Sequence, residues 1–233
     1  CHSSDKIMGP QPFVKFKNLG RMAFAQAYQI QREVARTLLD EVACHSHDTV
    51  SGNTVLLVEH DPVYTVGIRS KQYSAEVEER LRKLRADFVR TNRGGLVTFH
   101  GPGQLVAYPI LYLGSFFKDK SMRSYVHSLE QMIINFCARF HLEAKTTENT
   151  GVWIGENKIA AIGVHGSRYV TTHGIAINCN TDLGWFDHIV PCGIEDKGVT
   201  SLSRELGRVV TVNEAYPILV AAFEQQFKCT AVG

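Results

Sequence analysis

A cysteine between two turn-forming residues is the first position in this sequence that could do chemistry. Cys192 lies between Pro191 and Gly193, where a turn can expose the sulfur and let backbone amides point at a bound carbonyl. A cysteine in such a setting suits a nucleophile, although burial as a small apolar side chain is the commoner fate of this residue type. The local sequence leaves both interpretations open.

The other cysteines are weaker candidates. Cys179 ends an apolar run without flanking turn residues and ranks second, and we expect Cys44, Cys137 and Cys229 to be buried as small hydrophobes. The six cysteines form no C-x-x-C pair in a chain of 233 residues. A chain of this length does not need disulfides, so we expect a reducing compartment.

A reactive thiolate needs a neighbouring base or cation. Four histidines, none with metal-ligand spacing, are available: His100, His165, His173 and His188. Lys158 is the alternative, because it begins an otherwise apolar segment. A solvated lysine at the end of a strand is the plainer interpretation, and the residues alone favour it.

A glycine-rich segment runs from Arg93 to Gln104 and holds four glycines and one proline. Glycine permits positive φ angles and a close approach of the backbone to a ligand, so the segment could form the wall of a substrate site. It could equally be a plain connection. Its glycine spacing fits neither a P-loop nor a dinucleotide-binding loop, which argues against a phosphate cradle.

The elements that would position these residues follow from apolar periodicity. We predict helices over 23–42, 75–86 and 124–140, and a last helix that begins at a capping box, Thr211 to Glu214, contains Pro217 and ends near Phe227. Strands are predicted over 54–59, 105–111, 151–154, 158–164, 168–171 and 175–178. Helices packed on a largely antiparallel or mixed sheet give an α+β fold. Because no linker is evident, we expect a single domain over 13–233 after a flexible segment, 1–12.

Composition excludes several classes of function. The formal net charge is only +2 and the basic residues are scattered among acidic ones, so nucleic acid is not an expected partner. The apolar runs are too short to span a bilayer, which predicts a soluble protein without a membrane partner. The chain begins with Cys1 rather than Met, and we expect a processed or trimmed form from which any targeting segment has gone.

Ordered motifs along nearly the whole chain resemble the octanoyltransferases of lipoic acid synthesis, the LipB family of lipoyl(octanoyl) transferases. The motifs are E-H-D-P-V-Y-T-V-G at 59–67, R-G-G-L-V-T-F-H-G-P-G-Q at 93–104, T-G-V-W at 150–153, K-I-A-A-I-G at 158–163, H-G-I-A-I-N at 173–178, P-C-G-I at 191–194 and V-T-S-L at 199–202. The segment 181–192 is most similar to the animal mitochondrial member.

The resemblance implies a fold and a catalytic pair. The fold is similar to the catalytic domains of biotin and lipoate ligases, with a mixed, largely antiparallel sheet, packed helices and a small second sheet. Cys192 matches the family's nucleophile, and Lys158 matches the lysine that favours the thiolate and handles protons. Phe99 stands where many relatives have tyrosine, and without a hydroxyl it cannot form a side-chain hydrogen bond. The substrate-binding segments would be Arg93, Gly94, Gly95, Leu96, Val97, Thr98, Phe99, His100, Ala161, Ile162, Gly163, Gly174, Ile175 and Ala176.

The resemblance also implies substrates and partners. Octanoate would pass from acyl carrier protein, through a thioester on Cys192, to a lysine of lipoyl domains such as those of the glycine cleavage H protein and the 2-oxoacid dehydrogenase E2 subunits. This is the first step of lipoate biosynthesis. No metal or other cofactor would be needed, because the acyl group arrives on phosphopantetheine. We expect a monomer in the mitochondrial matrix, or in the cytoplasm if the chain is bacterial. The alternatives are an amidotransferase between carrier domains and an ATP-dependent lipoate ligase.

Overall fold

The structure, a computed structural model, describes residues 11–44, 50–71, 73–189 and 197–233. Its main sheet has the strand order β10 (Gly198–Val199), β8 (Asn157–Ser167), β9 (Val170–Asn178), β6 (Gln104–Ile110), β2 (Thr54–His60), β1 (Phe13–Met22) and β11 (Thr230–Val232), with β7 (Val152–Ile154) also paired to β8. Strand β8 pairs with β7 and β9, and β6 with β9 and β2, in antiparallel fashion. The pairs β10 with β8, β2 with β1 and β1 with β11 are parallel. The mixed, largely antiparallel sheet is therefore confirmed.

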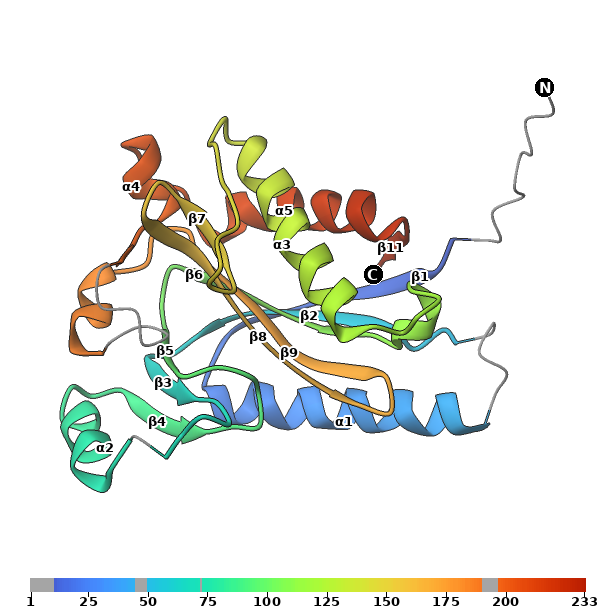
Figure 1. The fold of residues 1–233 in the computed structure, drawn as a ribbon, viewed down its shortest axis with the longest axis horizontal. Helices are drawn as coiled ribbons and strands as arrows, with labels where there is room; N and C mark the ends of the chain where they lie inside the picture. The colour runs from blue at the N-terminus through green and yellow to red at the C-terminus, as the bar shows by residue number, and fades with distance from the viewer. Residues whose placement is uncertain (1–10, 45–49, 72, 190–196) are drawn as a thin grey trace.

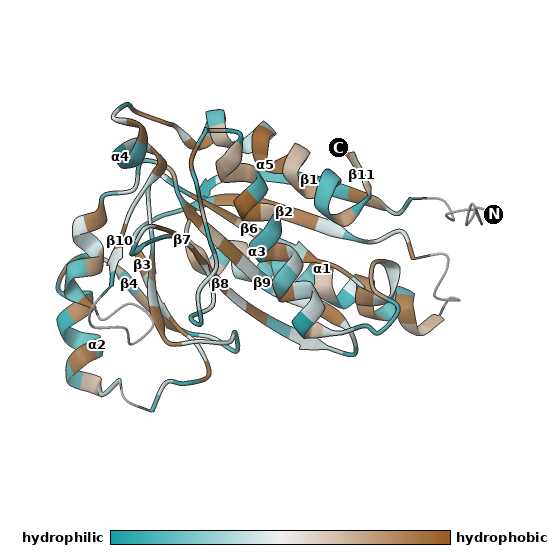
Figure 2. Ribbon diagram, turned by 45° about the horizontal axis from the view of Figure 1, so that its top comes forward, coloured by the Kyte–Doolittle hydropathy of each residue, from teal (hydrophilic) through white to brown (hydrophobic). Residues whose placement is uncertain are grey.

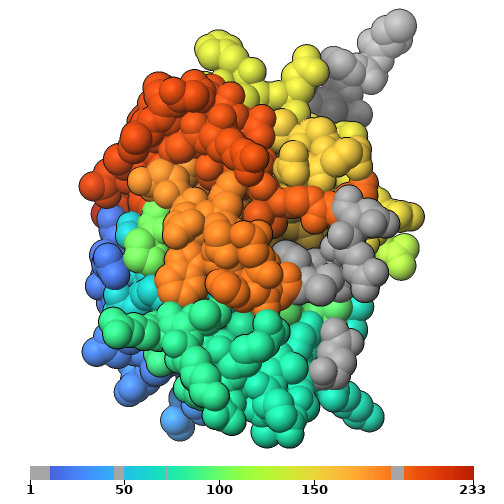
Figure 3. Space-filling model, turned by 90° about the vertical axis from the view of Figure 1, so that its left-hand side faces the viewer, coloured from blue at the N-terminus to red at the C-terminus, as the bar shows by residue number. Residues whose placement is uncertain are grey.

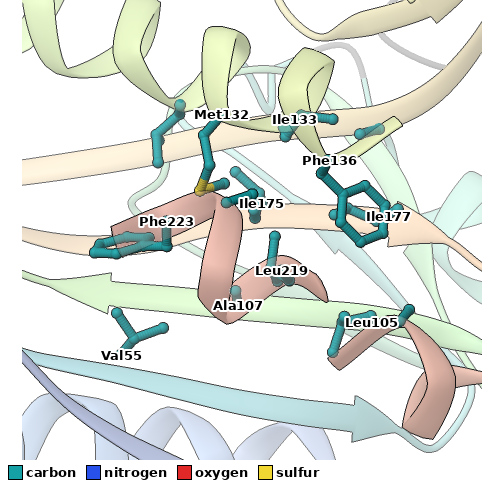
Figure 4. Close-up of a cluster of buried hydrophobic side chains, with 14 of the residues drawn as sticks. Val55, Leu105, Ala107, Met132, Ile133, Phe136, Ile175, Ile177, Leu219 and Phe223 are labelled. Carbon is teal, nitrogen blue, oxygen red and sulfur yellow. The ribbon is translucent and has the colours of Figure 1, made fainter. Parts of the chain in front are cut away.

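Helices cover both faces of the main sheet (Figure 1). Helix α1 (Phe24–Cys44) lies on one face, and α3 (Met122–Ala138) and α5 (Val212–Phe227) lie on the other. The side chains of β2 alternate between the two: Leu56 and Val58 pack in the cluster beneath α1, whereas Val55 and Leu57 pack under α3 and α5. The second cluster includes Met132 and Phe136 of α3 and Phe223 of α5, which point toward the sheet in Figure 4.

A second, smaller sheet has the order β4 (Asp87–Arg90), β3 (Val63–Val66) and β5 (Val97–His100). Its core joins Tyr64 and Phe99 of the sheet to Leu81 of α2 (Ala75–Arg82) and Phe186 of the 3₁₀ helix η3 (Leu183–His188). Figure 3 shows the orange segment that contains η3 against the green region of the small sheet. The glycine-rich segment 93–104 therefore contains β5 and links the small sheet to β6.

The predicted helices are confirmed with shifted ends. Helix α1 begins at Phe24 and α3 at Met122. The ribbon of α1 in Figure 2 carries both hydrophobic (brown) and hydrophilic (teal) residues, and the buried ones, such as Ala27, Ala35 and Leu38, recur at helical spacing. The predicted helix 75–86 was too long: α2 ends at Arg82, and Arg85 takes a positive φ of 61° before β4 begins at Asp87. The elements that were not predicted are strands β1, β3, β4, β5, β10 and β11, helix α4 (Leu202–Leu206) and the 3₁₀ helices η2 (Leu113–Ser115) and η3. All but β1 are six residues or shorter, so they offer too few periods to recognise.

The predicted strands 168–171 and 175–178 are one strand. Arg168 and Tyr169 have φ values of 48° and 64° and form the two-residue turn between β8 and β9. This turn geometry usually carries Asn-Gly or Gly-Gly, so an Arg-Tyr pair hides it from sequence patterns. Strand β9 then continues through His173 and Gly174 to Asn178.

The predicted capping box of α5 is half formed. The Thr211 side chain accepts a hydrogen bond from the backbone N–H of Glu214 at 3.2 Å. The Glu214 carboxylate binds Arg208 at 2.7 Å instead of turning back to the N-cap. The helix continues through Pro217 to Phe227 as predicted. In the described parts of the chain, no helix combines the length and apolar composition that crossing a membrane requires.

Candidate functional site

An apolar pocket lies where the main sheet, the small sheet and α1 meet. Its cavity volume is about 50 Å³, or about 500 Å³ when the open space at its mouth and between the lining atoms is counted. The pocket brings together eleven of the predicted substrate-binding residues: Arg93, Gly95, Leu96, Thr98, His100, Ala161, Ile162, Gly163, Gly174, Ile175 and Ala176. These come from three separate segments of the chain. The pairing of β8 with β9 places two of them side by side, since Gly163 is the cross-strand partner of Gly174 and Ala161 that of Ala176. The third is joined to β8 by the backbone N–H of Gly94, which donates to the carbonyl of Val164 at 2.9 Å.

Three predicted residues lie elsewhere. Thr98 and His100 of β5 face the pocket, but Val97 and Phe99 point to the other side of the strand and pack in the core of the small sheet. The Phe99 ring stacks on Trp185 with 4.8 Å between ring centroids. Successive side chains of β5 point to opposite sides of the strand, so only alternate residues of this strand face the pocket. Gly94 lines a neighbouring groove instead.

Five further residues complete the pocket: Phe24, Thr65, Val106, Tyr108 and His173. Of these five, only His173 is a candidate from the sequence, as one partner of the thiolate. Val106 and Tyr108 occupy alternate positions in a strand that is buried throughout, so only the packing of the sheet reveals which face meets the pocket. Phe24 is the first residue of α1 and was read simply as part of a helix.

Arg93 fastens the loop that forms one wall of the pocket. Its guanidinium is buried and donates to the carbonyl oxygens of Thr65 at 2.6 Å and Leu96 at 2.9 Å. A third donor reaches the carbonyl of Gly94 at 2.9 Å. Gly163 lets this arrangement form, because a Cβ there would lie 3.0 Å from Arg93 Cδ. The arginine thus serves to hold the loop against β3 and β8.

The buried histidines of this region are neutral near pH 7. Burial lowers the pKa of His60 to about 4 and the pKa values of His100 and His173 to about 3. Each ring keeps a polar partner: His60 and Tyr108 at 2.7 Å, His100 and Gln104 at 2.7 Å. An imidazole with so low a pKa carries no charge at neutral pH. His100 and His173 are therefore poor partners for a thiolate.

His173 reaches the pocket through an unusual backbone conformation. Its φ is 57°, in the left-handed region that residues other than glycine seldom occupy. The buried Gln31 side chain accepts its backbone N–H at 2.6 Å, and Asn92 binds its ring at 2.7 Å. These contacts hold the imidazole against Tyr28, with 5.4 Å between the ring centroids.

A groove that holds Lys158 adjoins the pocket, and we call it the lysine groove. Its lining is Arg69, Gly94, Gly95, Val126, Glu148, Asn149, Thr150, Lys158, Ile162, Gly163 and Val164. Gly95, Ile162 and Gly163 line both spaces and therefore divide them. Lys158 is only 5% exposed, so the solvated strand end favoured by the residues alone is wrong. Its ammonium donates to the carbonyl of Thr150 at 3.2 Å.

The cysteines differ in what the structure says of them. Cys192 falls in 190–196, outside the described residues, so its nucleophilic role stays a prediction. Cys179 is fully buried, and burial raises the pKa of its thiol to about 12, which excludes it as a neutral-pH nucleophile. Cys137 and Cys229 are buried as expected, but Cys44 is exposed at the end of α1. Within 11–44, 50–71, 73–189 and 197–233, no cluster of His, Cys, Asp or Glu could hold a metal ion.

Comparison with protein families gives a match over most of the chain. The profile of the lipoyl protein ligase A/B catalytic domain matches residues 34–224. The mitochondrial octanoyl-[acyl-carrier-protein]:protein N-octanoyltransferase of Danio rerio is 55% identical over 217 residues, covering 93% of each chain. An octanoyltransferase of Rubrobacter xylanophilus is 42% identical and covers 88% of this chain and 90% of its own.

Solved structures confirm the fold. The bipartite lipoate protein ligase of Thermoplasma acidophilum, described with its E2 lipoyl domain, superposes with a TM-score of 0.66 at 14% identity, covering 96% of this chain and 88% of its own. The biotin protein ligase of Aquifex aeolicus gives a TM-score of 0.50 at 13% identity and covers 92% of this chain and 69% of its own. The predicted likeness to both ligase folds is therefore confirmed.

Proposed function

The chain belongs to the lipoyl protein ligase A/B catalytic domain family, and on this premise we propose that it is an octanoyl-[acyl-carrier-protein]:protein N-octanoyltransferase. It moves an octanoyl group from acyl carrier protein to a lysine of another protein, as the first step of lipoate biosynthesis. The relatives that support this assignment carry that name and match nearly end to end. The observation that carries it in the structure is the buried Lys158 beside an apolar pocket.

The first half-reaction forms an acyl-enzyme. The Cys192 thiolate attacks the carbonyl carbon of the octanoyl thioester, a new carbon–sulfur bond forms, and the bond to the phosphopantetheine sulfur breaks. The Lys158 ammonium favours the thiolate before attack and gives its proton to the leaving sulfur afterwards. One thioester replaces another, so positioning and stabilisation of the oxyanion are the main tasks of the protein.

The second half-reaction forms the amide. The acceptor lysine attacks the acyl-enzyme as a neutral amine, and Lys158, now neutral, accepts the proton that the amine must lose. The carbon–sulfur bond to Cys192 breaks and the thiolate is restored next to the ammonium. Because an amide is more stable than a thioester, this half draws the whole reaction forward.

The apolar pocket is the site for the acyl chain. Ile162 and Ala176 offer apolar wall, and Gly163 and Gly95 leave room at the border with the lysine groove. Each methylene moved from water into such a site contributes about 0.8 kcal/mol, so eight carbons give several kcal/mol of binding. A chain lying in the pocket would place its carbonyl near that border, beside Lys158.

We propose acceptors and a location as well. The acceptors are lipoyl domains of the H protein and E2 subunits, and the acyl group comes on phosphopantetheine, so the enzyme needs no metal or other bound cofactor. The animal relatives are labelled mitochondrial, and we place this protein in the matrix as a monomer. An ATP-dependent ligase would require free octanoate and ATP, and an amidotransferase would take its acyl group from another carrier domain.

The test is an acyl-transfer assay followed by intact mass. Wild-type protein mixed with octanoyl carrier protein, without ATP, should gain one octanoyl group, and Cys192→Ser should gain no thioester. Cys44→Ser, which alters an exposed cysteine away from the pocket, is the matched control and should behave as wild type. An octanoyl thioester on the Cys192→Ser protein would overturn the assignment of the nucleophile. If octanoylation required ATP, the proposed transfer reaction would be wrong.

A further inference from the structure

The segment just before Lys158, residues 150–153, packs around the lysine side chain, and we call this segment the socket. Strand β7 pairs with β8, and in this pairing Trp153 is the direct cross-strand partner of Lys158. The Lys158 ammonium lies 4.7 Å from the centroid of the Trp153 ring, within the range of a cation–π contact. Both side chains are buried, with exposed fractions of 5% and 1%. The lysine therefore meets an aromatic face in a place from which water is largely excluded.

The indole ring is itself held in place. Its Nε1–H donates to the carbonyl oxygen of Asn149 at 3.2 Å. The backbone N–H of Asn149 donates in turn to the Thr147 hydroxyl at 3.1 Å, which fixes the bend of this loop. The backbone of Trp153 also exchanges two hydrogen bonds with Lys145, at 2.8 and 2.9 Å. A ring fixed at both its backbone and its nitrogen presents one face in one orientation.

Gly151 makes the space through which the lysine passes. Its φ is 122°, and a Cβ there would lie 2.7 Å from the carbonyl oxygen of Ala160 and 3.3 Å from Lys158 Cε. The Glu130 carboxylate accepts the Gly151 N–H at 3.2 Å. These contacts explain the residue types of the T-G-V-W motif. The threonine carbonyl accepts a hydrogen bond from the Lys158 ammonium, the glycine leaves space for the lysine side chain, and the tryptophan ring covers the ammonium.

We propose that Trp153 is a positioning residue, whose indole face holds Lys158 in its ammonium form at the end of the lysine groove. The face of an indole carries negative potential and favours a cation over a neutral amine, most strongly where water is excluded. The proposal rests on the proposed function only for what the ammonium then does, which is to favour the Cys192 thiolate and donate a proton. The contact itself can be tested without any acyl transfer.

Other charged groups also lie near Lys158. Glu148 and Arg69 line the lysine groove with opposite charges, and Glu130 faces the socket from α3. Lys197 approaches the same indole at 5.8 Å and is ion-paired with Glu156, which also meets Lys145 at 3.6 Å. A test that changes only the electron distribution of the Trp153 ring leaves these charged groups in place.

The experiment uses fluorinated tryptophan, which keeps the shape of the ring and weakens its negative face. The chain has two tryptophans, so a Trp185→Phe background leaves Trp153 as the single site of incorporation. The titration of Lys158 is followed by the chemical shift of ¹³Cε-labelled lysine, with its signal assigned by its loss in Lys158→Arg. We expect the midpoint to move to lower pH with each added fluorine, by about one pH unit over the series.

Lys120 provides the control in the same spectra. Its ammonium lies 5.4 Å from the Tyr112 ring centroid and 5.2 Å from that of Tyr169, so it contacts aromatic faces that fluorotryptophan does not change. Its midpoint should stay constant across the series. A Lys158 midpoint that also stays constant would overturn the proposal, and it would do so whether or not the protein transfers octanoate.

Substitution of Trp153 tests the same contact through the pH dependence of the reaction. Trp153→Leu should shift the alkaline limb of acyl-enzyme formation to lower pH, because Lys158 then loses its proton earlier, and Trp153→Phe should restore part of the shift. A shift of one unit lowers the rate on that limb about tenfold. A slower Trp153→Leu enzyme with an unmoved limb would mean a merely structural tryptophan and would contradict the proposal. Absence of acyl-enzyme in the wild type would instead count against the proposed function.

Discussion

At the scale of single residues, this site contains a buried side chain that is charged and buried polar side chains that are not. Lys158 is a buried cation held by a carbonyl and an aromatic face, whereas His60, His100 and His173 are polar groups without charge near pH 7. Their hydrogen-bond partners carry no charge and include the Tyr108 hydroxyl, the Gln104 side-chain amide and the Met22 backbone carbonyl. Such partners satisfy a neutral imidazole but do not offset the cost of burying a charged one.

The neutral histidines predict a stability that falls with acid. Below pH 6.5 the unfolded chain binds a proton at His60, but the folded protein does not until about pH 4. Stability is therefore fully present above pH 6.5 and is lost as the pH falls toward 4, by about 1.4 kcal/mol per pH unit for this group. Urea unfolding at pH 7, 6 and 5 should show a shallower decline in His60→Gln than in the wild type.

The matched control is His127→Gln, which removes an exposed histidine of α3. It should leave the pH slope of the unfolding free energy as in the wild type. Equal slopes in wild type and His60→Gln would mean that His60 is charged in the folded protein near neutral pH. The neutral state assigned to His60 would then be wrong.

At the scale of elements, the pocket depends on close approach between strands. Gly174 of β9 lies against β6, and a Cβ at this position would be 2.1 Å from the carbonyl oxygen of Ala107 and 2.6 Å from Pro109 Cδ. Both neighbours belong to a buried strand and have no free space to move into. Glycine is thus required where β9 lies against β6 beside the pocket.

Gly174→Ala should therefore destabilise the protein and distort the pocket. Forcing a methyl group into a filled site costs about 1–3 kcal/mol, and thermal unfolding should show a Tm several degrees lower. Gly184→Ala is the control, because Gly184 is exposed and its nearest neighbour is the end of the Asp182 side chain at 3.2 Å. If Gly174→Ala and Gly184→Ala unfold at the same temperature, β9 is not as tightly packed against β6 as described.

At the scale of the whole molecule, the pocket exists because two sheets meet. Ala161 and Ala176 come from the main sheet, Thr98 and His100 from the small sheet, and Phe24 from α1. Neither sheet encloses the pocket alone. On the main-sheet side, much of the pocket wall is made by the small alanines and glycines of β8 and β9. The small size of these residues therefore sets the width of the pocket.

Ala161→Leu should shorten the acyl chain that the enzyme accepts. A larger side chain fills part of the pocket, and each methylene that no longer fits loses about 0.8 kcal/mol, or about fourfold in transfer rate. Octanoyl transfer should fall much more than butyryl transfer, as measured by competition between the two carriers. Ala25→Leu, at an exposed position of α1, should leave the ratio unchanged. An unchanged ratio in Ala161→Leu would place the acyl chain elsewhere.

Local patterns were sufficient for the long helices, for most core strands and for the motifs that led to the family. Apolar periodicity is visible in any stretch of several turns, and α1, α3 and α5 begin or end within a few residues of their predicted limits. Motif order likewise led to Lys158 and to the segments that line the pocket. Short strands such as β4 and β5 were beyond this reach, because their residues are held by pairing with β3 rather than by their own pattern.

The tertiary structure alone decided which side chains face the site. Phe99 and His100 are adjacent in sequence, yet one packs in the core of the small sheet and the other lines the pocket, since strand register sets the direction of each. Lys158 reads as a solvated strand end until β7 folds back over it and Trp153 covers its ammonium. Burial and partnership depend on which segments pack together and in what register, and the pattern of residues along the chain does not reveal that.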